Sequence, residues 1–263
     1  MRALLIDITK CIGCGACVAA CRDQNHLPNP ADAPPPQKLD ASNFTILKQV
    51  ERKGETLTYR RLCMHCLDPT CQSVCPVGAF KKTAAGPVLY DESRCIGCRY
   101  CLQACPFDVP RYEWSSLQPR VRKCNLCAER VAQGRPNACA EACPTGATIA
   151  GEREELLRTA RARLAAEPEK YVPHIYGEHE AGGTSVLFLS PIPFEELDLP
   201  SNLIQEPLPM LTFRVLGKIP YFVPLGGAFL GAVWWITNRR QEVAAAEQEE
   251  HKPRPPKAKE EPR

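Results

Sequence analysis

Sixteen cysteines dominate the chemistry available to this 263-residue chain, and they fall into four groups of four. The groups are Cys11, Cys14, Cys17 and Cys21; Cys63, Cys66, Cys71 and Cys75; Cys95, Cys98, Cys101 and Cys105; and Cys124, Cys127, Cys139 and Cys143. Such tight grouping, beside 44% hydrophobic residues and no leading apolar signal segment, favours metal binding over a disulfide framework. We find no phosphate loop, nucleophile motif or histidine-based metal motif, so no catalytic residues are expected and the thiols are the candidate site.

The spacing within the groups indicates which metal the thiols bind. The first and third groups have the C-x2-C-x2-C-x3-C run that is typical of ligands to [4Fe-4S] clusters. Three thiolates three residues apart can wrap a loop around an iron–sulfur cube, and Gly13, Gly15 and Gly97 would let backbone amides approach the sulfides. The alternative is a zinc-binding scaffold, since C-x2-C pairs also build tetrahedral zinc sites. Zinc needs two separated pairs, whereas two groups here add a third cysteine at once and three end in Cys-Pro, so we expect four [4Fe-4S] clusters.

The ligand sets depend on how the groups pair. In proteins with two such clusters, the fourth cysteine of each run ligates the other cluster. Only a candidate hairpin at residues 78–91 and a few flanking residues separate the second and third groups, so these two should form one unit, inserted into a second unit made by the first and fourth. The expected iron ligands are Cys11, Cys14, Cys17 and Cys143 (site 1); Cys63, Cys66, Cys71 and Cys105 (site 2); Cys95, Cys98, Cys101 and Cys75 (site 3); and Cys124, Cys127, Cys139 and Cys21 (site 4).

Two further patterns concern this arrangement. The other three groups end in Cys-Pro, whereas Arg22 follows Cys21. The ligation of the partner cluster by Cys21 is therefore the least regular of the four ligand exchanges. We expect the clusters to alternate between the two units along the chain of sites.

Residues 1–150 carry 19 Lys and Arg against 13 Asp and Glu. That excess of six positive charges would offset the charge of about −2 that each cluster has with its four thiolates.

Short elements must position these loops. Strands are predicted at residues 3–9, 78–83, 88–91 and 147–150, and a helix at residues 152–166, where leucine and alanine recur at helical spacing. The Pro-rich residues 28–37 are predicted to be an extended linker. The predicted fold class is α+β, with two interleaved bacterial-ferredoxin-like modules: an outer module (1–62 with 115–150) and an inserted inner module (63–114). An extension, residues 151–218, would hold the helix and a docking segment.

One segment is long and apolar enough for a membrane. Residues 219–238 are uncharged, and 20 residues at 1.5 Å each match the ~30 Å hydrocarbon layer, which predicts one transmembrane helix before a disordered, charged tail at 239–263. Two positive charges precede this helix and five follow it, which places the tail in the cytoplasm and the cluster domain in the periplasm of a bacterium. Without a signal peptide, the chain would be exported bound to a partner. A soluble polyferredoxin is the alternative.

Four motifs carry a resemblance to a known family: CIGCGACVAACRDQN, YRRLCMHCLDPTCQSVCPVGAF, RCIGCRYCLQACPFDVP and KCNLCAERVAQGRPNACAEACPTGA. Over roughly residues 3–240 the sequence resembles the four-cluster beta subunits of the DMSO reductase iron–sulfur subunit family. YGEHEAGGTSVLFLSPIPFEELDLP, followed by one helix, is most similar to the beta subunits of hydrogenase-2 and respiratory formate dehydrogenases. The resemblance implies a non-catalytic electron relay between a molybdopterin or nickel–iron catalytic subunit and a quinone-reactive or cytochrome b membrane subunit, and no nucleic-acid partner.

Overall fold

The computed structural model describes residues 1–28, 36–52 and 54–250, so most of the expected linker at 28–37 lies outside the described residues. The chain divides into two compact units. The cysteine unit is Met1–Leu211 and contains all four cysteine groups, and the helical unit is Thr212–Arg263.

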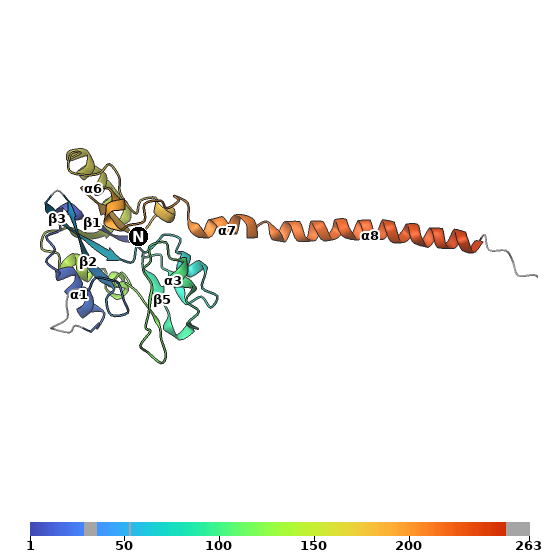
Figure 1. The fold of residues 1–263 in the computed structure, drawn as a ribbon, viewed down its shortest axis with the longest axis horizontal. Coiled ribbons are helices and arrows are strands. Elements are labelled where there is room, and N and C mark those ends of the chain that lie inside the picture. The colour runs from blue at the N-terminus through green and yellow to red at the C-terminus, as the bar shows by residue number, and fades with distance from the viewer. Residues whose placement is uncertain (29–35, 53, 251–263) are drawn as a thin grey trace, which may run out of the picture. The chain divides into compact units, whose positions relative to one another are not determined.

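A three-stranded sheet in the order β8–β1–β9 lies within the cysteine unit. Its central strand β1 is labelled in Figure 1. Strand β1 (Arg2–Asp7) pairs antiparallel with β8 (Thr148–Glu152) and parallel with β9 (Val186–Leu189). Because β1 precedes the first cysteine group and β8 follows the fourth, their pairing joins the two ends of the cysteine-bearing segment. The predicted strands at 3–9 and 147–150 are therefore confirmed, although β1 ends at Asp7, where a 3-10 helix (Ile8–Lys10) begins.

The side chains of β1 alternate between two cores, as a strand buried on both faces requires. Ala3 and Leu5 pack with residues of α6 (Arg153–Ala166), which confirms the predicted amphipathic helix to within one residue. Leu4 and Ile6 belong to the larger core, which also holds side chains from the cysteine groups. One strand thus connects the supporting helix to the layer of the cysteines.

Short helices and hairpins carry the cysteine groups. The helices are α1 (Ala16–Gln24), α2 (Thr70–Ser73), α3 (Tyr100–Ala104), α4 (Ala128–Ala132) and α5 (Ala138–Glu141). The hairpins pair β2 (Thr45–Arg52) with β3 (Glu55–Leu62), β4 (Phe80–Lys82) with β5 (Val88–Tyr90), and β6 (Arg111–Tyr112) with β7 (Val121–Arg122). The predicted hairpin at 78–91 is confirmed, whereas the sequence reasoning missed the other two. Helix α1 packs against α5, and α2 against α3, so the contacts link the first group to the fourth and the second to the third.

The segment 151–218 is more than an extension. Strand β9 is completely buried, and further 3-10 helices at Glu180–Gly182 and Phe194–Leu197 contribute Ala181, Phe194 and Leu197 to the core. This part of the chain therefore completes the central sheet, a role that the sequence reasoning did not assign to it.

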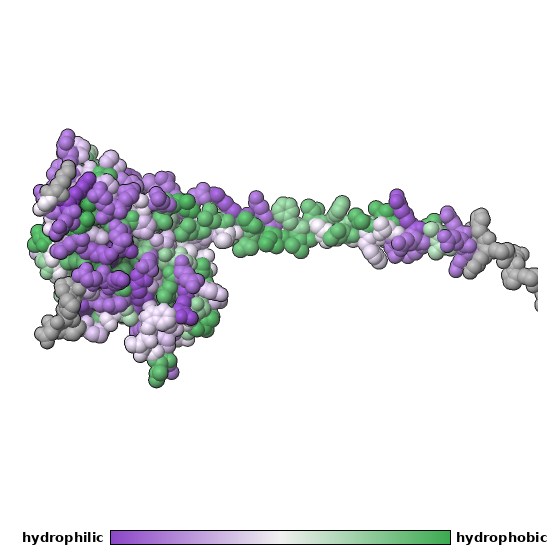
Figure 2. Space-filling view, in the orientation of Figure 1, coloured by the Kyte–Doolittle hydropathy of each residue, from purple (hydrophilic) through white to green (hydrophobic). Residues whose placement is uncertain are grey.

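Helix α8 (Ile219–Glu250) makes up most of the helical unit, and α7 (Leu208–Leu216) precedes it. Within the described ranges, the run Leu208–Glu249 is the one helical stretch long and apolar enough to cross a membrane. Figure 2 shows apolar residues along the first part of α8 and hydrophilic residues towards its end. The predicted disorder of the tail is wrong for residues 239–250, because QEVAAAEQEE at 241–250 contains strong helix formers and neither glycine nor proline. The rest of the tail lies outside the described residues.

Candidate metal-cluster sites

An aspartate sets the entry of the chain into each of the two CIGC loops. The Asp7 carboxylate accepts hydrogen bonds from the Thr9 backbone N–H (3.2 Å) and hydroxyl (2.6 Å). Asp91 accepts the equivalent bonds from Ser93 (3.0 and 2.6 Å). Each cap starts a 3-10 helix that ends directly before the first cysteine of its group. The sequence analysis missed this repeat, although its signal, Asp-x-(Thr/Ser)-x-Cys, occurs before both Cys11 and Cys95.

The glycine inside each loop has a conformation that other residues rarely adopt. Gly13 has φ +70° and Gly97 has φ +71°, both in the left-handed region. A Cβ atom at Gly97 would lie 2.6 Å from the Tyr112 hydroxyl, and one at Gly13 would lie 3.0 Å from the Thr58 hydroxyl. Glycine therefore lets the loops pack closely, and the Gly97 N–H is free to donate to the Cys95 Sγ (3.4 Å).

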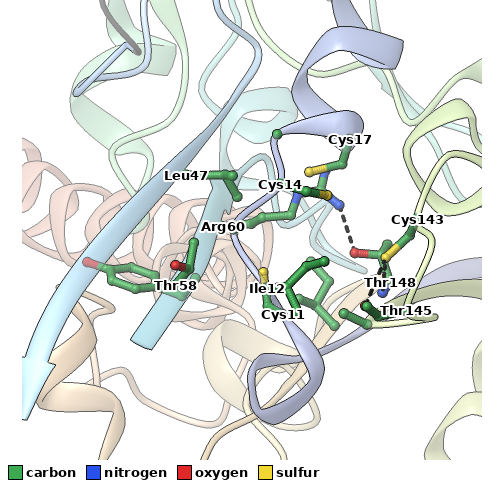
Figure 3. Close-up of a pocket in the computed structure, with 15 residues that line it drawn as sticks. Cys11, Ile12, Cys14, Cys17, Leu47, Thr58, Arg60, Cys143, Thr145 and Thr148 are labelled. Atoms are coloured by element: carbon green, nitrogen blue, oxygen red, sulfur yellow. Dashed lines mark hydrogen bonds between the residues drawn. The ribbon is translucent and has the colours of Figure 1, made fainter. Parts of the chain in front are cut away.

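The four cysteines expected at site 1 line one hollow of about 420 Å³ that is partly open to solvent. Figure 3 shows Cys11, Cys14 and Cys17 on one stretch of chain and Cys143 facing them from another. The backbone N–H of Thr148, the first residue of β8, donates to the Cys143 Sγ (3.4 Å), so the sheet itself positions this sulfur. The structure therefore brings together these cysteines of the first and fourth groups.

The cysteines expected at site 2, Cys63, Cys66, Cys71 and Cys105, line a second hollow, of about 360 Å³. No aspartate or glutamate lines either hollow among the residues that the structure describes. His65 lies in the second wall, buried rather than at the surface, and its Nδ1 accepts a hydrogen bond from the Val88 N–H (2.9 Å). Burial, with the nearby Lys123 and Lys82, lowers the pKa of His65 well below its usual value, so the ring is neutral at pH 7.

The remaining two sets are also neighbours. Burial raises the pKa of Cys101 to about 12, and Cys95, Cys98 and Cys75 add to the shift. Burial likewise raises the pKa of Cys21 to about 12, with further contributions from Cys139 and Cys127. Each set therefore includes the cysteine that the ligand exchange would bring from the paired group. This cysteine is Cys75 at site 3 and Cys21 at site 4.

The substitution of Arg22 for proline has a local structural reason. Proline disfavours a helical conformation in the residue before it. Helix α3 accordingly ends at Ala104, one residue before Cys105, whereas α1 continues through Cys21 to Gln24. Cys21 therefore projects from within a helix, and its side chain is buried.

The sets follow one another through the unit. Burial raises the pKa of the Cys17 thiol of site 1, Arg60 lowers it, and Cys139 of site 4 raises it further. Burial raises the pKa of Cys124 of site 4, and the next largest contributions come from Cys21 and from Cys63 of site 2. The interaction between Cys71 and Cys101 then connects site 2 to site 3. These neighbours favour the order 1, 4, 2, 3, in which the sites would not alternate between the modules.

The surroundings of the thiols fit a sulfur-ligated, multi-iron group. Each hollow has four cysteines on its wall and, among the described residues, no aspartate or glutamate, which is a sulfur donor set. Burial raises the pKa of Cys11, Cys17, Cys66, Cys71 and Cys105, so these thiols are protonated at pH 7, whereas ligation to iron would deprotonate them. Two buried cations, Arg60 beside site 1 and Lys123 beside site 2, would compensate the resulting negative charge.

Comparisons with known proteins agree with this chemistry. Two family models, each described as a 4Fe-4S dicluster domain, match residues 10–79 and 55–153, which together contain all sixteen cysteines. The hydrogenase-2 operon protein HybA of Escherichia coli O157:H7 is 39% identical over 239 residues, which cover 75% of this chain and 72% of HybA. The nitrate-inducible formate dehydrogenase iron-sulfur subunit of Escherichia coli K12 is 38% identical over 205 residues (71% and 67%). A protein of Nitratidesulfovibrio vulgaris is 37% identical over 257 residues (94% and 70%).

Proposed function

We propose that the chain relays electrons between a catalytic subunit and a quinone-reactive subunit in the membrane. The chain belongs to the family of ferredoxin-type iron–sulfur subunits, and this membership supports the proposal. The chain is an electron-transfer subunit with four [4Fe-4S] clusters, and the zinc-scaffold alternative is not supported by the matched families. The relatives named for hydrogenase-2 and formate dehydrogenase support a catalytic partner of the nickel–iron or molybdopterin type. We propose that this polypeptide does no catalysis alone.

The observation that carries the proposal is the continuous succession of cysteine sets. A bound cluster accepts and gives up one electron while its thiolate ligands stay in place. We assign the ligands of sites 1 to 4 to the sets expected from the sequence, since the neighbours of Cys143, Cys105, Cys75 and Cys21 all support the exchange. Cys14 of site 1 and Cys98 of site 3 are the exposed cysteines, whereas all four at site 4 are buried. The two ends of the succession therefore face solvent, where partners can exchange electrons with them.

The interleaving of the two modules is part of the same proposal. The pairing of β1 with β8 and the packing of α1 against α5 support an outer module made of the first and fourth groups. The packing of α2 against α3 supports an inner module made of the second and third. The two matched family models follow the chain in order and overlap at residues 55–79, so they are compatible with either spatial pairing.

We also propose an orientation. The apolar part of α8 would anchor the chain in the inner membrane, with the tail in the cytoplasm and the cysteine unit in the periplasm. Arg239 and Arg240 directly follow the apolar stretch, and Arg214 and Lys218 precede it, so the larger basic cluster, which continues with Lys252, Arg254 and Lys257, lies on the tail side. Protease treatment of spheroplasts tests this proposal: digestion of the cysteine unit in intact spheroplasts supports it, and protection of the unit refutes it.

Purification of the complex tests the relay. A tagged full-length chain would be solubilised anaerobically in detergent, and its partners would be identified by mass spectrometry. We expect hydrogen or formate to reduce the clusters only in preparations that contain the catalytic subunit, and a quinone analogue to reoxidise them only when the membrane subunit is present. Fully loaded chain that co-purifies with no oxidoreductase subunit, or whose clusters stay oxidised in a complex that turns over substrate, would refute the proposal.

A further inference from the structure

Arg60 of β3 is a fully buried cation with an unusual set of partners. Its side chain is 2% exposed, and its guanidinium donates to the hydroxyl oxygens of Thr45 (3.2 and 3.3 Å) and Thr148 (3.1 Å). No carboxylate lies within ion-pair distance of Arg60 among the described residues. The other buried arginines, Arg130 and Arg153, each form an ion pair with a glutamate.

Leaving a buried charge without an opposite charge costs several kcal/mol, so a counter-charge is expected close to Arg60. Among the residues that the structure describes, the groups near Arg60 that can become anionic are cysteine thiols, which lose their protons when they bind iron. Ionised Cys139 and Cys17 would favour the charged guanidinium. The hydroxyl groups of Thr45 and Thr148 hold the guanidinium in place.

The position of Arg60 is shared by two sites. Its side chain lines the hollow of site 1, where Figure 3 shows it reaching between Cys17 and Thr148. Its partner Cys139 belongs to site 4. Arg60 therefore lies between the two sets of the outer module, at the step from site 1 to site 4.

We propose that Arg60 raises the reduction potentials of the clusters at sites 1 and 4 together. The two potentials would then stay close enough for electrons to pass between the two outer clusters. The inference rests on the proposed relay function. Transfer between two clusters oxidises one by one electron and reduces the other by one, and the reduced cluster has one more negative charge. A nearby buried cation favours that extra charge because there is little solvent to screen the interaction.

The test is a redox titration of the full chain, followed by electron paramagnetic resonance, with Arg60→Gln and Arg60→Lys. For Arg60→Gln we expect the ratio of reduced to oxidised cluster at a fixed potential to fall roughly tenfold for two of the four clusters, a shift of ~59 mV for a one-electron centre. Arg60→Lys keeps the positive charge and should stay close to wild type. Arg61→Gln is the matched control, because this neighbouring side chain does not line the hollow of site 1 and donates to the carbonyls of Asp198 and Phe107 (3.0 Å to the latter).

Three outcomes overturn the proposal: unchanged potentials in Arg60→Gln, a shift confined to one cluster, or equal shifts in Arg60→Gln and Arg60→Lys, which would indicate shape rather than charge. If Arg60→Gln binds less iron, its clusters are reconstituted and the titration is made on the fully loaded fraction, where the same two shifts are expected. The expected shifts of two reduction potentials in Arg60→Gln, found in a chain that exchanges electrons with no partner, would refute the relay. They would leave the role of Arg60 standing.

Discussion

The ligand exchange at Cys21 gives the sharpest prediction, because the structure places this thiol among the cysteines of the fourth group. Cys21 interacts most strongly with Cys139, Arg60 and Cys127, and its own-group neighbour Cys17 ranks after them. If Cys21 ligates the cluster at site 4, removing Cys21 and Cys139 together damages only one cluster. Removing Cys21 and Cys17 damages two.

The magnitude follows from the ligand count. With sixteen cysteines in four sets, each cluster accounts for one quarter of the iron and of the reducible spins. Cys21→Ala and Cys21→Ala/Cys139→Ala should both retain about three quarters of the wild-type spins, whereas Cys21→Ala/Cys17→Ala should retain about one half. The assay is spin integration of the reduced, anaerobically purified chain, with iron determined on the same samples.

The reverse pattern would refute the reasoning. If Cys21→Ala/Cys17→Ala retained three quarters of the spins and Cys21→Ala/Cys139→Ala one half, Cys21 would bind with its own group, and the departure at Arg22 would mark a true break in the exchange. The same comparison at Cys143, with Cys11 as the expected partner and Cys139 as the control, tests the other half of the outer module.

Three further predictions concern the anchor, a loop and the ion pair of His174 with Glu180. Leu230→Arg puts a charge near the centre of the apolar stretch at a cost of about 2.5–3.5 kcal/mol, so more protein should be released from membranes by a carbonate wash. Gly97→Ala brings a Cβ within 2.6 Å of the Tyr112 hydroxyl in a left-handed conformation, so it should lower iron occupancy at site 3. The hydrogen bond with Glu180 raises the pKa of His174, so the stability advantage of wild type over His174→Gln should be complete below the ordinary histidine pKa and lost as the pH rises through the raised one, as unfolding by urea would show.

Matched variants separate these effects from general damage. Leu230→Met keeps the helix apolar and should stay in the membrane. Gly134→Ala has a left-handed φ but nothing within 4 Å of the added Cβ, so it should keep full iron occupancy. Equal release of Leu230→Arg and Leu230→Met, normal spins in Gly97→Ala, or a pH-independent effect of His174→Gln would each contradict its prediction.

Patterns that are local in the sequence predicted the structure best. The spacing of the cysteines, the hairpin at 78–91 and the helix near 152–166 all depend on contacts within a few residues, and each was read from the sequence. The cysteine groups that the sequence paired were found as neighbours because the length of the connection between Cys75 and Cys95 limits what they can reach. The hairpin of β2 and β3 was missed, although Thr56–Tyr59 alternates polar and apolar residues shortly after Gly54.

Features that depend on distant contacts could not be read in the same way. Strand β9 pairs with β1 across more than 170 residues. An apolar run such as VLFL does not indicate which strand it will pair with. Arg60 and Arg61 are adjacent arginines on one strand, so alternation puts one inside and one outside. Which of them is inside depends on the register of β3, and a shift of one residue would exchange them.

The burial of Arg60 links the loading of clusters to the folding of the unit. Thr45, Thr148 and the thiols of two sites surround a guanidinium that has no carboxylate among its described neighbours. Protonated thiols are neutral and leave that charge uncompensated, whereas thiolates bound to iron supply negative charge on both sides of it. We therefore expect cluster insertion to stabilise β3 and β8, the strands that carry Arg60 and Thr148, and through the pairing of β8 with β1 the central sheet as well.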